Sequence, residues 1–254
     1  MTRWQRRLAI LATVLVAGAC SAPPSSSSPA APTSLPWPSS ADLGTIRGLI
    51  ISRAGDELTS IGFGGGTVIV GLRAGAVDLA KQIVDAYGAA VEVTVGFFRY
   101  PSGALVDGAC AVPGTLSDNA ALRATVEMAS LRITSGTTFD PTVRITDIGT
   151  ASVTVQTSNS LEVYLFRPGG TKPVGAFDLG VAGMGLETSV EPAKSITIPG
   201  YGGTASCDIS LGYTLAPGPY QARALVDFAI GPEGGNGPHV FWSDPLDVEI
   251  VPAP

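Results

Sequence analysis

The chain has 254 residues, of which 14% are charged and 45% hydrophobic, and its 32 glycines and 20 prolines supply many turns. This length can bury a hydrophobic core, and the composition excludes a coiled coil, a collagen and a fully disordered chain. The formal net charge of −6 argues against a nucleic-acid partner, because phosphate backbones are bound by clustered Lys and Arg. The single histidine, His239, excludes most metal sites and most histidine-dependent nucleophiles.

The first residues have the pattern of an export signal. A cationic start precedes an apolar run from Leu8 to Ala19, which is too short a helix to span the hydrocarbon core of a bilayer. The run ends in Ala17-Gly18-Ala19-Cys20, which resembles a bacterial lipobox, where a cysteine after small residues receives diacylglycerol and becomes the mature N-terminus. The resemblance implies a signal peptide over residues 1–19 and lipid attachment at Cys20. An ordinary secretory cleavage site after Ala19 is the alternative.

Residues 20–40 are rich in Pro and Ser and contain too few apolar side chains to fold alone, so we expect an extended tether. Arginine far outnumbers lysine, and Ala, Gly, Val and Pro are abundant, which is typical of high-GC bacterial coding. We therefore expect an extracytoplasmic protein that is lipid-anchored to a bacterial cell membrane.

Residues 41–112 are predicted to form a small α+β module. Helical periodicity is clearest over residues 76–87, where apolar side chains recur three and four residues apart and Gly88 follows as a cap: Val77, Ala80, Val84 and Tyr87. Strands are predicted over residues 45–52, 67–72 and 91–98, so residues 67–98 form a β-α-β unit. The glycine cluster at residues 62–66 is followed by a strand rather than by the helix of a dinucleotide-binding fingerprint, which favours a hairpin loop.

Residues 113–254 show no helical periodicity but carry eight β-rich runs separated by turn residues. The runs are residues 126–134, 142–146, 152–157, 161–166, 194–198, 206–213, 221–230 and 246–251. This number and spacing predicts an antiparallel β-sandwich. The segments 143–155 and 161–170, with the turn at 215–220, resemble bacterial immunoglobulin-like modules, including the intracellular proteinase inhibitor type. The resemblance implies an immunoglobulin-like sandwich over residues 125–252.

Export and acylation of Cys20 would leave two cysteines in an oxidising compartment, Cys110 and Cys207. Two cysteines suffice for one bridge, which would join the module to the sandwich. Two unpaired thiols are the alternative.

Few side chains stand out as chemically active. Four aromatic residues in or near glycine-rich loops are possible partner contacts: Phe63, Tyr201, Phe241 and Trp242. Acidic side chains at Asp244, Asp247 and Glu249 could offer oxygens to calcium, but they alternate along a strand and lack a calcium-loop spacing, so solvated strand positions are expected. His239 is expected to be an exposed loop side chain.

These features predict a non-catalytic binding or scaffolding protein of the cell envelope, without cofactor or metal. The partners expected are the membrane, through the lipid, and an unidentified envelope protein or polymer. An envelope hydrolase with a carboxylate-only site, or a protease inhibitor as the family resemblance implies, are the alternatives.

Overall fold

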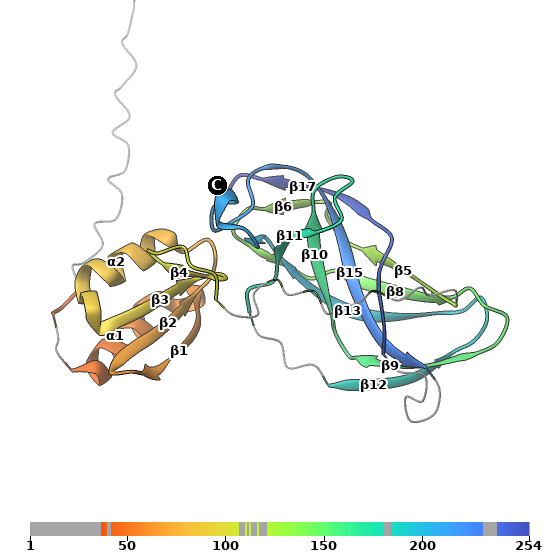
Figure 1. Ribbon diagram of the computed structural model, residues 1–254, viewed down its shortest axis with the longest axis horizontal. Coiled ribbons are helices and arrows are strands. Elements are labelled where there is room, and N and C mark those ends of the chain that lie inside the picture. Colours follow the sequence, from red (N-terminus) through yellow and green to blue (C-terminus); the bar gives the residue numbers. More distant parts are fainter. Residues whose placement is uncertain are drawn as a thin grey trace, which may run out of the picture. The chain divides into compact units, whose positions relative to one another are not determined.

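The computed structural model describes residues 37–39, 42–106, 110, 112, 116, 121–179, 184–230 and 238–253. The predicted signal peptide, Cys20 and most of the tether lie outside these residues. Trp37–Pro254 forms one compact unit, which contains a four-stranded sheet with two helices and a thirteen-stranded sheet (Figure 1). In the part of the chain described, neither helix has the length and apolarity needed to cross a membrane.

The first sheet has the strand order β1-β2-β3-β4. Neighbouring strands run antiparallel except β2 and β3, which are parallel and are connected through α2. The elements are α1 (Leu43–Ala54), the 3-10 helix η1 (Gly55–Glu57), β1 (Leu58–Gly64), β2 (Thr67–Leu72), α2 (Val77–Tyr87), the 3-10 helix η2 (Gly88–Ala90), β3 (Val91–Val95) and β4 (Phe98–Tyr100).

Helix α1 replaces the strand predicted over residues 45–52, so that prediction is wrong. The Asp42 carboxylate accepts the Thr45 N–H at 2.7 Å and caps the helix. This hydrogen bond satisfies one of the backbone N–H groups that have no partner within the first turn of a helix. The buried residues Ile46, Ile50 and Ala54 recur every four positions, and this face packs on the sheet. Tertiary packing therefore overrides the β propensity of the isoleucine-rich sequence.

Helix α2 ends at Gly88, whose φ of 52° suits glycine as a helix cap. Its fully buried positions are Ala80 and Ile83, with Tyr87 close behind, whereas Val77 and Val84 are only partly buried. Two residues of the predicted stripe, Ala80 and Tyr87, are thus buried, and Ile83 rather than Val84 lies between them in the core. Both helices and the inward side chains of β2 and β3 form one hydrophobic cluster.

The larger sheet is compatible with a β-sandwich. Its main path is β12-β9-β15-β10-β13-β8-β5, and the other strands pair with this path or with one another. The strands are β5 (Leu122–Glu127), β6 (Arg132–Thr134), β7 (Thr138–Phe139), β8 (Thr142–Asp147), β9 (Val153–Ser158), β10 (Leu161–Phe166), β11 (Pro173–Ala176), β12 (Gly185–Val190), β13 (Ser195–Gly203), β14 (Ala205–Ser206), β15 (Gly218–Ile230), β16 (Pro238–Trp242) and β17 (Leu246–Val251). Strand β15 is the longest and pairs with β9, β10, β16 and β17.

Inward side chains of these strands form the largest core, with Val163, Ile145 and Val226 fully buried. At the start of β15 the Tyr220 hydroxyl donates to the Ala216 carbonyl at 3.0 Å, which fixes the turn before the strand.

Two of the predicted runs are interrupted in the structure. Strand β14 stops at Ser206, and residues Ile209–Leu211 form the 3-10 helix η3, because the Asp208 carboxylate accepts the Ser210 N–H at 2.9 Å. The run at residues 126–134 is divided between β5 and β6. The predicted runs at 161–166 and 246–251 coincide with β10 and β17.

Candidate functional site

Phe63 lies in β1, next to the Gly65-Gly66 hairpin turn, and its side chain is 58% exposed. The Arg47 guanidinium of α1 lies over the ring, 5.8 Å from its centroid. Ile51, one helical turn further along α1, is 41% exposed. We call Arg47, Ile51 and Phe63 the β1-edge patch. A stacked arginine beside exposed apolar side chains is typical of a binding surface.

Strand β1 itself forms an edge of the four-stranded sheet (Figure 1). Among the strands described it pairs only with β2. The outer edge of β1, opposite β2, therefore carries backbone N–H and C=O groups that form no hydrogen bonds to a described strand.

The other predicted contact aromatics pack inside the fold. The Tyr201 ring lies 5.1 Å from that of Phe177 in an edge-to-face arrangement. Trp242 meets Tyr164 and Phe166 edge-to-face, with ring centroids 5.4 and 4.9 Å apart. Tyr164 and Phe166 are buried, so Trp242 covers a secondary core.

Phe241 and His239 both pack on the buried ring of Phe228. Phe241 approaches it edge-to-face at 5.5 Å, and His239 is stacked on it at 5.3 Å. His239 was expected to be an exposed loop residue, but it lies in β16 and is only partly exposed. Of the four predicted contact residues, Phe63 is the one that the structure leaves mainly in solvent.

Glu162 of β10 is a partly buried carboxylate that the sequence analysis did not single out. It accepts hydrogen bonds from the Tyr164 hydroxyl at 2.6 Å and from the Phe177 backbone N–H. Burial raises the pKa of Glu162, and the two hydrogen bonds offset part of that rise. Burial, with the adjacent carboxylate, also raises the pKa of Tyr164. The local sequence of β10 does not indicate that this carboxylate is partly buried, because some of the residues around it come from other segments of the chain.

Asp178 connects the sandwich to the α+β module. Its carboxylate accepts the Ala74 N–H at 2.7 Å. Ala74 lies just before α2, and Ala76, the N-cap residue of α2, provides no side-chain hydrogen bond. Burial raises the pKa of Asp178, while the Ala74 hydrogen bond and the charge of Arg73 oppose the rise. The Asp178 carboxylate therefore fixes the loop before α2, whose own first turn carries the acidic residue Asp78.

Cys110 and Cys207 form a disulfide with a Cα–Cα distance of 5.6 Å across a sequence separation of 97. Both cysteines pack against the secondary core around Tyr164 and Phe166. A stable disulfide of this kind indicates an oxidising, extracytoplasmic environment.

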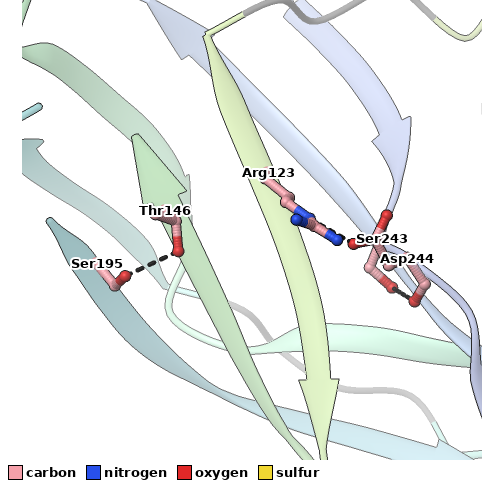
Figure 2. Close-up of polar contacts among 5 residues, drawn as sticks. All are labelled: Arg123, Thr146, Ser195, Ser243 and Asp244. Atoms are coloured by element: carbon pink, nitrogen blue, oxygen red, sulfur yellow. Dashed lines mark hydrogen bonds and ion pairs between the residues drawn. The ribbon is translucent and has the colours of Figure 1, made fainter. Parts of the chain in front are cut away.

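The acidic residues considered for calcium have protein partners. Asp244 pairs with Arg123 of β5, as Figure 2 shows, Asp247 accepts from the Gln221 side chain at 3.0 Å, and Glu249 pairs with Arg132 at 3.3 Å. Within the described ranges, no three side chains of His, Cys, Asp or Glu gather as metal ligands.

The hydroxyl pair Thr146 and Ser195, 2.8 Å apart and exposed on β8 and β13, also appears in Figure 2. It bridges neighbouring strands, and neither hydroxyl has a described histidine or carboxylate as a hydrogen-bond partner. The pair therefore reads as a cross-strand contact of the sheet.

Comparisons with known proteins give only distant similarities. No protein-family model and no curated protein matches the chain. Among solved structures, the sporulation control protein Spo0M of Bacillus subtilis is 12% identical, with a TM-score of 0.26 over 54% of this chain and 51% of its own. A β-glucosidase of Listeria innocua is 13% identical, with a TM-score of 0.26 over 52% of this chain and 16% of its own. A PapD-like domain of human CEP192 is 10% identical, with a TM-score of 0.22 over 57% of this chain and 96% of its own. TM-scores of this size do not establish a common fold.

Proposed function

We propose that this chain is a non-catalytic binding or scaffolding protein of a bacterial cell envelope, held at the membrane by a lipid on Cys20. The β1-edge patch carries the proposal. Phe63 keeps 58% of its side chain in solvent although hydrophobic clusters are available in the same module. Burying such a ring against a partner is worth about 1.5–3 kcal/mol, so its exposure suits a contact residue.

The location rests on three features of the sequence and structure. The run before Cys20 resembles a lipobox, residues 20–40 have a tether composition, and Cys110 and Cys207 are disulfide-bonded. Together they support a domain displayed outside the membrane of a high-GC bacterium. The sandwich is inferred to be of the immunoglobulin-like type, whose loops and edges commonly bind partners.

A carboxylate-based hydrolase is the second candidate, because Glu162 is partly buried and has a raised pKa beside two tyrosines. A general acid needs such an environment, but the Glu162 carboxylate is engaged by Tyr164 and the Phe177 backbone. The same contacts serve packing equally well. Protease inhibition follows only from the family resemblance of the sandwich.

The binding proposal is tested with Trp37–Pro254, which forms one compact unit, against an isolated envelope fraction. We expect saturable binding that Phe63→Ser weakens by about tenfold or more. Leu105→Ser is the matched control, because Leu105 is 53% exposed in the same module but lies outside the β1-edge patch. Equal losses in the two variants would contradict a role for the patch.

Two further measurements separate the alternatives. The same protein should not hydrolyse peptides, esters or envelope glycans; turnover that Glu162→Gln abolishes would favour the hydrolase. In the full chain, Cys20→Ala should move the protein from the detergent phase to the aqueous phase or leave it unprocessed, and a wild-type mass without a lipid would contradict anchoring.

A further inference from the structure

The open edge of β1 is seven residues long and has no proline or lysine to block pairing with another strand. In a hairpin with a two-residue turn, the pair beside the turn is hydrogen-bonded, so Gly64 and Gly62 direct their backbone groups towards β2. Ile61 and Phe63 then direct their N–H and C=O groups outwards. The register irregularity between Leu58 and Ser60 confines the regular part of the edge to the hairpin side.

We propose that β1 pairs antiparallel with β1 of a second copy of this chain, about a two-fold axis at Gly62. The proposal rests on the proposed function, since it names a partner for the β1-edge patch. Two four-stranded sheets would join into one continuous sheet, with Ile61 and Phe63 forming hydrogen-bonded pairs on both sides of the axis.

The side chains fit this arrangement. Phe63 would lie opposite Ile61 of the partner subunit, and an aromatic side chain opposite a β-branched one is a favourable cross-strand pair. Phe63 shares its sheet face with Val68, its partner in β2, so this pair lies on the face covered by α1. The exposed side chain of Ile51 on α1 would then approach the axis together with Phe63. The exposed apolar side chains of the patch would thus be buried together.

A cysteine at the axis tests the geometry. Gly62 and the partner subunit's Gly62 would form a non-hydrogen-bonded pair with Cα atoms about 4.5 Å apart, a distance that a disulfide can span. A Cβ at Gly62 meets no atom within 4 Å, so Gly62→Cys should fold. We expect Gly62→Cys to give a covalent dimer of Trp37–Pro254 under mild oxidation. Gly48→Cys, which also has open space at its Cβ but lies on α1, should remain non-covalent.

Dissociation in solution tests the same contact. Because a symmetric dimer buries two copies of Phe63, Phe63→Ser should raise its dissociation constant by about a hundredfold in sedimentation velocity over a dilution series. Leu105→Ser, an exposed apolar change outside the β1-edge patch, is the control and should leave the constant unchanged.

A protein that stays monomeric, or a dimer that neither cross-links at Gly62→Cys nor weakens in Phe63→Ser, would overturn the proposal. Saturable, Phe63-dependent binding of a monomeric protein to the envelope fraction would leave the proposed function standing while the dimer fails. Loss of both would overturn both.

Discussion

The packing of α2 can be tested at two adjacent residues, Ile83 and Val84. Ile83 is fully buried in the cluster formed by both helices and the sheet, whereas Val84 is only partly buried at its margin. Ile83→Ala removes buried carbon atoms and leaves a cavity, which costs about 2–5 kcal/mol in the free energy of unfolding. Val84→Ala removes less carbon from a position that is already partly hydrated, so we expect about 1 kcal/mol or less.

Thermal unfolding of Trp37–Pro254 measures the difference. A cooperative unit of this size shifts its Tm by roughly 2–4 °C per kcal/mol, so Ile83→Ala should lower the Tm by roughly 4–20 °C and Val84→Ala by no more than about 4 °C. Gln82→Ala, an exposed change on the same helix, is the control. A larger loss for Val84→Ala than for Ile83→Ala would mean that Val84, as expected from the sequence, and not Ile83 lies at the centre of the buried face of α2.

Removal of the disulfide by Cys110→Ser with Cys207→Ser should lower the free energy of unfolding by about 4–5 kcal/mol, because the bridge closes a loop across a separation of 97 residues; an unchanged denaturant midpoint would contradict this. Glu162 should make stability depend on pH, because its pKa is raised in the folded state and the folded protein therefore binds the proton more tightly. The free energy of unfolding should fall as the pH rises from the pKa of Glu162 in the unfolded chain through its pKa in the folded protein. Glu162→Gln should remove this part of the slope above about pH 4.5 in urea titrations, and parallel pH profiles for the two proteins would refute the assignment. Asp178→Ala leaves the Ala74 N–H near α2 without its acceptor and should lower stability by about 1–3 kcal/mol, whereas Asp178→Asn, which keeps an oxygen there, should lower it less; equal effects would argue against the hydrogen bond.

Part of the candidate site follows from the sequence. Phe63 can be recognised because an aromatic residue among glycines has few neighbours in the chain that could cover it. Tyr201, Phe241 and Trp242 have the same local signature, yet each packs on another ring: Phe177, Phe228, and the Tyr164 and Phe166 pair. Their partners come from other segments of the chain, and no local pattern indicates which aromatic side chain will find one.

The sequence alone determined the features that depend on short-range chemistry. Apolar residues at helical spacing before Gly88 indicated α2, β-rich runs between turn residues indicated β10 and β17, and the two cysteines other than Cys20 left one possible pairing. Only the tertiary structure decided what depends on contacts between distant segments. The segment around Ile46 and Ile50 has β-forming side chains, but it became helical because a sheet offered its four-residue spacing a face to cover. Glu162 became partly buried for the same kind of reason: Tyr164 is its neighbour in β10, but the Phe177 backbone N–H reaches it from another segment of the chain.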